Sequence, residues 1–345
     1  MLKQRLLLPT YLLSIACGLF LRYFDGRCFS AFKQQGPLRA LREKAGLELR
    51  TRVSNPNMTY TPETRKLLGR ISAARERGDW QKVRSLYRSY SGMELPVFHA
   101  VLHAAYGCGQ YSEAAATYDE LCHLNITLDG AAFATGIKIF AKLGDPERVR
   151  SIWTDAMQSC KLDEVIAAAR IDAAAAEGDI ESAAKVLDQM NRTGVNINIA
   201  HITSAIRACW EAPGSGHNAA EYLFNLSLAL DLQPNVVTFT SLMGAYASAP
   251  LSRILCARDV MKTLQVSANK AFAEVYLNTL LQNTKEEWQD VRAVQAVCAK
   301  LAKKSPERLA VARRALAEFR KDKVTLTTLS ETIERALELE ELDYD

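Results

Sequence analysis

The chain has 345 residues, enough for two ordinary domains or one extended array, and its net charge of +4 neither demands nor excludes a nucleic-acid partner. Hydrophobic residues make up 48% of it, which is enough to bury a core. The eight cysteines are widely scattered and form no CxxC pair, which favours buried thiols in a reduced compartment over a disulfide framework.

Residues 1–50 are predicted to be a targeting leader. Residues 1–42 carry seven basic side chains against one acid, Asp25, and residues 6–21 form an apolar run interrupted by Pro9. A basic start before an apolar core is typical of a secretory signal or a membrane anchor, whereas the acid-poor stretch behind it is typical of an organelle transit peptide. We favour targeting to a mitochondrion or plastid. The alternatives are membrane anchoring through residues 6–21, if these are uncleaved, and an ordinary first helix.

Residues 51–63 contain two prolines and several turn formers, so they are predicted to be a linker. Residues 64–283 are then predicted to form about six helix-turn-helix repeats. A glycine recurs there at spacings of 31, 35 and 34 residues, at Gly78, Gly109, Gly144 and Gly178. An apolar helical pattern precedes each glycine, and an alanine or valine follows it by five positions. Because one hairpin cannot bury its apolar face alone, this pattern predicts an all-α fold, a superhelical α-solenoid of stacked hairpins.

The turns are predicted from the same residues. Glycine permits a tight turn, and the aspartate that follows three of the four glycines is suited to cap the second helix of its hairpin. Two later units have looser turns, with "APGSGH" at residues 212–217 and "SAPLS" at residues 248–252. A degenerate seventh repeat is expected to start near Phe272.

Residues 284–345 are predicted to be a helical cap. The stretch Ala299–Lys323 holds nine basic and three acidic residues, which suits RNA phosphates, an acidic partner, or only the polar end that a repeat array needs. The acidic, amphipathic segment of residues 331–345 is expected to pack onto this basic stretch or to dock a partner.

Two segments of the repeats resemble a known family. Gln233–Ala249 resembles the opening of a pentatricopeptide repeat, and Ala173–Asn198 resembles the close of one. The rival is the tetratricopeptide repeat, which usually has a small residue eight positions into its first helix. The corresponding residues here are all large: Ile71, Leu102, Ile137, Ile171, Ile206 and Met243. The resemblance to pentatricopeptide repeats covers residues 64–269, and it implies a right-handed superhelix that binds single-stranded RNA in mitochondria or plastids.

The resemblance also implies that the fifth and last residues of a repeat together read one base. Two such pairs have hydrogen-bonding side chains and would favour adenine, Thr203 with Asn235 and Thr240 with Asn269. His99 and Asp129 are further candidates at these positions. The other fifth positions, Leu68, Ala134 and Ala168, offer no side-chain hydrogen bond. The alternative is that the terminal Asn and Asp residues only cap the following helix and that the threonines are only exposed hydroxyls.

Phosphate contacts are expected to supply most of any RNA affinity. We expect Lys138, Arg170 and Arg207 to lie four residues after the fifth position in three successive units and so to form a basic stripe along the groove, with an ordinary solvated face as the alternative. His99 and His103 are spaced like zinc ligands, but no second motif completes a ligand set, so no metal or other cofactor is expected. The sequence contains no nucleotide-binding or hydrolase motif and no signature of a fused nuclease or deaminase.

These observations favour a non-enzymatic, organellar RNA-binding protein that supports RNA processing, stability or translation. The alternative is a protein-interaction scaffold, in an organellar ribosome or a respiratory assembly, whose groove holds a peptide of an organellar protein partner. An RNA-processing enzyme is a third hypothesis, and the missing catalytic ligands count against it. Binding to phosphates weakens steeply with added salt, whereas binding by an apolar groove does not.

Overall fold

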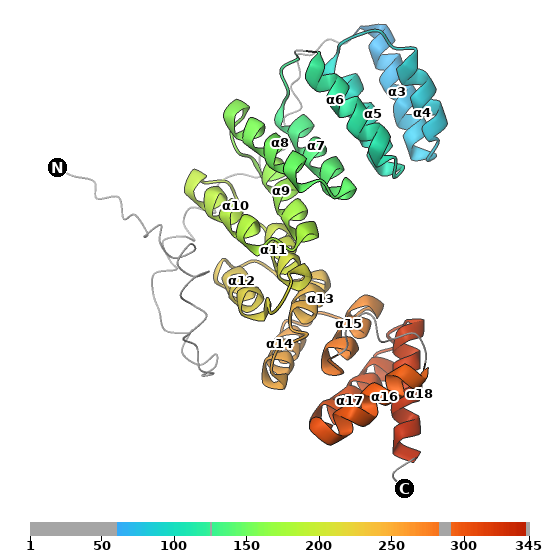
Figure 1. Cartoon of the computed structure of the whole chain (residues 1–345), viewed down its shortest axis with the longest axis vertical. Coiled ribbons are helices and arrows are strands. Elements are labelled where there is room, and N and C mark those ends of the chain that lie inside the picture. The colour runs from blue at the N-terminus through green and yellow to red at the C-terminus, as the bar shows by residue number, and fades with distance from the viewer. Residues whose placement is uncertain (1–60, 125, 283–290, 343–345) are drawn as a thin grey trace, which may run out of the picture. The chain divides into compact units, whose positions relative to one another are not determined.

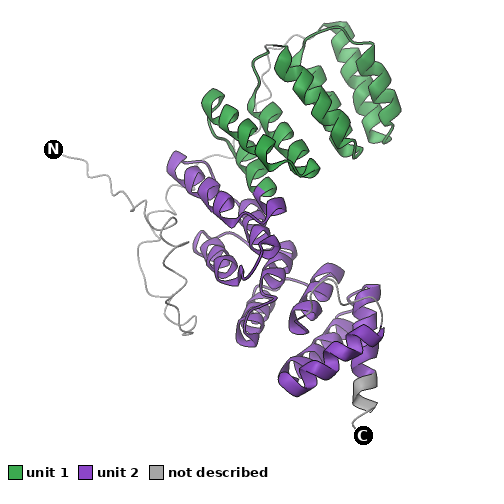
Figure 2. Ribbon diagram, viewed as in Figure 1, with its two compact units in different colours: residues 1–173 green, residues 174–345 purple. Residues whose placement is uncertain are grey.

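The computed structural model describes residues 61–124, 126–282 and 291–342, so the predicted leader of residues 1–50 lies outside the described residues. The described residues form helices and turns without a strand, which confirms the all-α fold class. They divide into two compact units, residues 1–173 and residues 174–345 (Figure 1, Figure 2). Helix α9 (Glu164–Glu177) contains the boundary between the two units.

The first unit consists of paired helices. Its elements are α3 (Pro62–Glu76), α4 (Trp80–Arg88), α5 (Leu95–Gly107), α6 (Tyr111–His123), α7 (Gly130–Leu143) and α8 (Pro146–Ser159). Helix A, the first helix of each hairpin, packs against its own helix B and against the helix A of the next hairpin. Helices α4 and α6 also pack on the helix A that follows them. Each hairpin thus covers its neighbour, which confirms the predicted helix-turn-helix repeats.

The turns within the hairpins have the predicted chemistry. The four recurring glycines have φ between +66° and +71°, a left-handed conformation that disfavours other residues: Gly78, Gly109, Gly144 and Gly178. The aspartate after three of them caps helix B by accepting a backbone hydrogen bond at 2.9 Å, at Asp79, Asp145 and Asp179. The first repeat starts earlier than predicted, because Thr61 caps α3 and Pro62 is suited to its first turn.

The second unit continues the repeats. Its elements after α9 are α10 (Ile180–Thr193), α11 (Ile199–Glu211), α12 (His217–Ala229), α13 (Val236–Ala245), α14 (Leu251–Thr263), α15 (Lys270–Leu280), α16 (Val291–Lys304), α17 (Pro306–Lys321) and α18 (Thr328–Leu342). The looser turns at residues 212–217 and 248–252 connect α11 to α12 and α13 to α14, as predicted. Helix α15 is the expected start of a seventh repeat, and it packs on α13 and α17.

The basic C-terminal stretch is two helices rather than one. Helix α16 ends at Lys304 and α17 begins at Pro306, since proline has no N–H to continue a helix but fits its first turn. Helix α18 packs against both, and Glu334 forms an ion pair with Arg320, which confirms that the acidic segment folds back onto the basic one.

Not all basic residues of this stretch face solvent. Arg308 is buried and donates hydrogen bonds to three backbone carbonyls, those of Ala249 at 2.9 Å, Thr279 at 3.2 Å and Leu280 at 3.3 Å. Two of these carbonyls belong to the last residues of α15, which no further turn of that helix satisfies. Arg308 is therefore part of the core and is not among the basic residues of this stretch that can reach a ligand.

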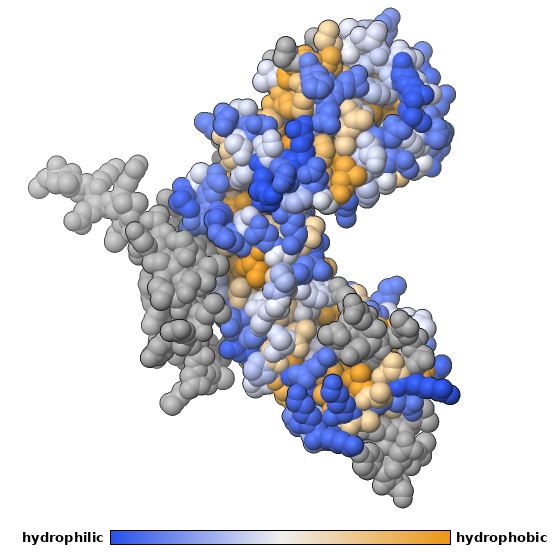
Figure 3. All heavy atoms as spheres, in the orientation of Figure 1, coloured by the Kyte–Doolittle hydropathy of each residue, from blue (hydrophilic) through white to orange (hydrophobic). Residues whose placement is uncertain are grey.

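The core runs along the faces that the hairpins share. The large residues at the eighth positions of helices A have no exposed surface: Ile71, Leu102, Ile137, Ile171, Ile206 and Met243. On the face drawn in Figure 3, apolar side chains (orange) appear only as patches among hydrophilic ones. Cys209 and Cys298 are buried as predicted, whereas Cys122 on α6 and Cys256 on α14 are exposed.

Candidate nucleic-acid interface

From the second repeat onward, the last residue of a repeat caps the helix A of the next hairpin, whereas Glu94 before α5 makes no side-chain cap. Asp129 Oδ1 accepts a hydrogen bond from the backbone N–H of Ala132 at 2.9 Å. Asn235 Oδ1 accepts from Val237 at 2.9 Å and from Thr238 at 3.1 Å. The same arrangement occurs at Asp163, Asn198 and Asn269. The capping role is therefore confirmed, while contact of these residues with bases stays a prediction.

Capping leaves part of each asparagine side chain unused. Asn235 and Asn269 are exposed, and they cap through their carbonyl oxygens alone. Neither Nδ2 atom donates a hydrogen bond to any residue that the structure describes. Each amide thus keeps two N–H donors for a ligand.

The predicted pair Thr203 and Asn235 is brought together through a third residue. Thr203 Oγ1 lies 2.8 Å from Thr238 Oγ1, and Thr238 Oγ1 lies 3.4 Å from Asn235 Oδ1. Thr238 is fully buried and also accepts from the backbone N–H of Asn235 at 3.3 Å, which completes a capping box. Sequence reasoning missed Thr238, although a hydroxyl at the third position of a capped helix was a signal for it.

The second predicted pair is arranged differently. Thr240 is half-buried and donates its hydroxyl hydrogen to the carbonyl of Val236 at 2.7 Å. Asn269 Oδ1 accepts from the backbone N–H of Phe272 at 2.9 Å. No hydrogen bond links Thr240 to Asn269 within the part of the chain that the structure describes. The Thr240 oxygen can therefore still accept a hydrogen bond from a ligand, but its hydrogen is already donated to the carbonyl of Val236.

His99 and Asp129, at the fifth and last positions of the second repeat, also come together. His99 Nε2 lies 3.1 Å from Asp129 Oδ1, with the histidine side chain 21% exposed and the aspartate 54% exposed. The His99 contact, opposed in part by burial, lowers the pKa of the Asp129 carboxyl below its ordinary value. The pair therefore presents a carboxylate to solvent at neutral pH.

Basic side chains gather on helices A of the first unit. Burial lowers the pKa of His103, and the charges of Arg75, His99 and Lys138 lower it further. Arg75 belongs to α3 and Lys138 to α7, so positive charge from the helices A on both sides of α5 lies within electrostatic reach of His103. An electropositive surface of this kind attracts phosphates.

The predicted basic stripe needs one correction. Lys138 is half-buried and Arg207 is exposed, but Arg170 is only 4% exposed. Arg170 follows Ala168 by two residues instead of four, which turns it by about 200° around the helix. The equivalent of Lys138 on α9 is Asp172, so Arg170 does not extend the stripe.

A row of small apolar residues at the second positions of the helices A from α7 to α15 was also missed. These side chains are exposed and uncharged: Ala131, Val165, Ala200, Val237 and Ala271. The two valines are 49% and 57% exposed, which is unusual for their type. Each lies within the turn that the capping Asn or Asp begins. The sequence did contain a signal for this row, since no charged residue occurs at these positions although they face water.

Two other expectations concern metal and membrane. Among the residues described, no three histidine, cysteine, aspartate or glutamate side chains converge on one point, although His99 and His103 share a helix. Within the same residues, no helix combines the length and apolar character of a membrane span. The apolar run of residues 6–21 lies outside the residues described.

Comparisons with known proteins found similar structures but no similar family. No family model matches the chain, and no curated protein matches it. The pentatricopeptide repeat protein PPR10 in complex with an 18-nt psaJ RNA element is 15% identical, with a TM-score of 0.48, over 80% of this chain and 43% of that one. PPR10 from maize is 17% identical, with a TM-score of 0.45, over 79% of this chain and 48% of that one. The chain spans less than half the length of each of these two proteins.

Proposed function

We propose that the chain binds single-stranded RNA along the helices A of its repeats and that it acts as a binding protein rather than an enzyme. The main support is two threonine–asparagine pairs at the helices A α11, α13 and α15. These pairs are Thr203 with Asn235 and Thr240 with Asn269. Each pair offers an amide donor, from Asn235 or Asn269, and a hydroxyl oxygen, from Thr203 or Thr240. The exposed Val237 beside Asn235 offers an apolar surface to a base face.

The direction of the hydrogen bonds supports a preference among bases. Thr240 commits its hydrogen to Val236, so its oxygen can only accept from a ligand. The amide nitrogen of Asn269 keeps both of its N–H donors for a ligand, because the oxygen is the atom that caps α15. If the threonine oxygen faces the exocyclic group and the amide faces the ring nitrogen, this pair matches the amino group and ring nitrogen of adenine or of cytosine, whereas guanine and uracil present a carbonyl oxygen and an N–H at those places. We therefore propose two adjacent positions that favour amino-bearing bases, adenine first.

Binding of fluorescein-labelled A12 and U12 oligonucleotides to the full chain tests the base assignment by fluorescence anisotropy. Wild type is expected to prefer A12. The double variant Thr203→Ala and Thr240→Ala removes about one net hydrogen bond at each base, so this preference should fall roughly fivefold to thirtyfold. An unchanged preference in the double variant would remove the assignment.

Salt dependence tests the proposed phosphate contacts separately. Replacing Lys138 or Arg207 with alanine is expected to weaken A12 and U12 binding alike and to reduce the slope of log affinity against log salt by about 0.7 each. Lys185→Ala is the matched control, because Lys185 lies on helix B and pairs with Glu181 at 2.7 Å. Equal slopes for Lys138→Ala and Lys185→Ala would contradict a phosphate contact at Lys138.

We also propose that this binding serves the processing, stability or translation of organellar transcripts. The support is the basic, acid-poor composition of residues 1–50. Fusion of residues 1–50 to a fluorescent protein is expected to direct it to mitochondria or plastids. Retention in the cytosol or in the secretory pathway would contradict the organellar assignment and leave the RNA assignment standing.

A further inference from the structure

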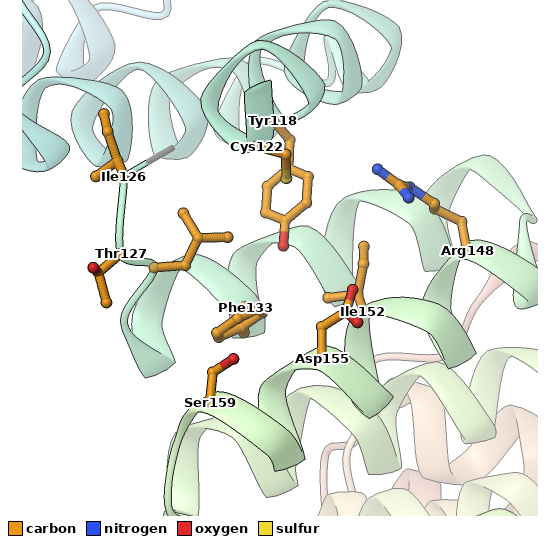
Figure 4. A pocket seen from close by; sticks show the side chains of 10 residues that line it. Tyr118, Cys122, Ile126, Thr127, Phe133, Arg148, Ile152, Asp155 and Ser159 are labelled. Atoms are coloured by element: carbon orange, nitrogen blue, oxygen red, sulfur yellow. The ribbon is translucent and has the colours of Figure 1, made fainter. Parts of the chain in front are cut away.

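An open hollow of about 480 Å³ lies between helices B of the first unit (Figure 4). Its lining comes from α6, α7, α8 and the loop before α7, with Tyr118, Cys122, Ile126, Phe133, Ile152 and Asp155 as the main residues. The Tyr118 hydroxyl points toward the middle of the hollow. None of the residues proposed to contact RNA lines it. We call it the Tyr118 hollow.

The position of the Tyr118 ring is determined by its neighbours. A Cβ atom at Gly136 would lie 2.5 Å from the ring, so glycine at this position leaves the space that the ring occupies. The ring packs edge-on against Phe140 at 6.0 Å, and the residue as a whole is 1% exposed. Burial raises the pKa of Tyr118, so the hydroxyl stays protonated and able to donate.

An equivalent hollow occurs one repeat earlier, and there the tyrosine and the acid form a hydrogen bond with each other. It has about 360 Å³ and places Tyr87 and Glu120 where the Tyr118 hollow has Tyr118 and Asp155. Tyr87 donates a hydrogen bond to Glu120 at 2.7 Å. In the Tyr118 hollow no hydrogen bond joins Tyr118 to Asp155 among the described residues, and the neighbouring Cys122 offers only a thiol, which is a weak acceptor.

The Tyr118 hollow therefore holds two groups without a strong partner among the described residues. Asp155 is exposed and forms no ion pair there. The nearby Arg148 does not neutralise it, because Arg148 pairs with Asp119 at 2.6 Å and lies over the Phe140 ring at 5.4 Å. An apolar floor, one hydrogen-bond donor and one carboxylate remain available to a ligand.

We propose that the Tyr118 hollow binds a segment of a partner protein that presents an arginine or lysine beside an apolar residue. The long stem of such a side chain lies on Phe133 and Ile152 while its cation pairs with Asp155. A backbone carbonyl of the segment accepts the hydrogen bond of Tyr118. This docking site goes beyond RNA binding and does not depend on it.

Methyl NMR on the full chain with labelled isoleucine tests the proposal, with acetyl-Leu-Arg-amide as the probe. The methyl signals of Ile126 and Ile152 are expected to shift and to saturate. Acetyl-Leu-citrulline-amide, the neutral isostere, should bind about tenfold more weakly, since it cannot form the ion pair. Equal binding of the two peptides, or no saturable shift with either, would overturn the proposal.

Two variants locate the contact. Asp155→Asn, at an exposed position that the fold does not use, should weaken the arginine peptide about tenfold, and Tyr118→Phe about fivefold. Glu120→Gln is the matched control, because it changes the equivalent acid of the satisfied hollow, and it should leave the affinity unchanged. Equal losses from Asp155→Asn and Glu120→Gln would contradict a specific contact. Affinity for A12 should be unchanged in Asp155→Asn whether or not the peptide binds.

Discussion

Alanine substitution of the glycines at the two ends of α10 separates two energetic costs of replacing a turn glycine. One is the strain of a left-handed backbone, and the other is the overlap of the new Cβ atom with its neighbours. Gly178 and Gly194 both have left-handed backbones in the second unit, with φ of +66° and +75°. A Cβ at Gly194 would meet no atom within 4 Å. A Cβ at Gly178 would lie 2.7 Å from the backbone oxygen of Glu211 and 2.9 Å from Cα of Ala212.

Both variants lose about 1 kcal/mol of unfolding free energy to the left-handed backbone. Gly178→Ala also forces the α9–α10 turn away from the end of α11. Since the obstructing atoms are backbone, they cannot rotate aside, and such overpacking costs about 1–3 kcal/mol more. We therefore expect a loss of about 1 kcal/mol for Gly194→Ala and of roughly 2–4 kcal/mol for Gly178→Ala.

Urea unfolding followed by far-UV circular dichroism measures both losses, with an m-value fitted for each variant. The two variants share a unit and flank the same helix, so their comparison removes most effects of the unfolded state. A difference below about 0.5 kcal/mol between them would refute the close approach of the turn to α11.

Three further predictions follow from single contacts. Arg308→Met leaves three buried carbonyls without their donor, so it should lower the unfolding free energy by about 3 kcal/mol, measured by urea denaturation. A loss below about 1 kcal/mol would contradict this. Asp145→Ala removes a helix cap and should cost about 1 kcal/mol, while Asp145→Asn should restore most of it. His99→Ala should raise the pKa of Asp129 in an NMR titration. Because that pKa is lowered by folding, the stabilisation from Asp129 is present above about pH 4 and is lost as the pH falls through the lowered value.

Much of the fold was predictable because some positions admit few residue types. A left-handed turn requires glycine, so the spacing of Gly78, Gly109, Gly144 and Gly178 is enough to locate four hairpins along the chain. Asn235 was placed correctly ahead of a helix A for a similar reason, since few side chains can cap a helix. These requirements are local, so the residue type and its position in the sequence are enough to recognise them.

The features that were predicted wrongly or not at all depend on contacts between hairpins or on the exact position of a residue around its helix. Arg170 and Lys138 occur in the same helical context, and a difference of two residues decides which of them reaches solvent. Arg308 belongs to a basic run, but carbonyls of other helices surround it. Whether a tyrosine meets its carboxylate also depends on how neighbouring hairpins pack, so sequence alone does not distinguish Tyr87 from Tyr118.

The buried hydroxyl of Thr238 has a consequence for how the proposed base preference could evolve. It has no exposed surface and cannot touch RNA, yet it orients the hydroxyl of Thr203 and the backbone of Asn235. A valine at this position would keep nearly the same shape and release Thr203 to rotate, so that its hydroxyl donates as readily as it accepts. Discrimination between bases would then broaden through a residue inside the protein, with every group that faces the ligand unchanged.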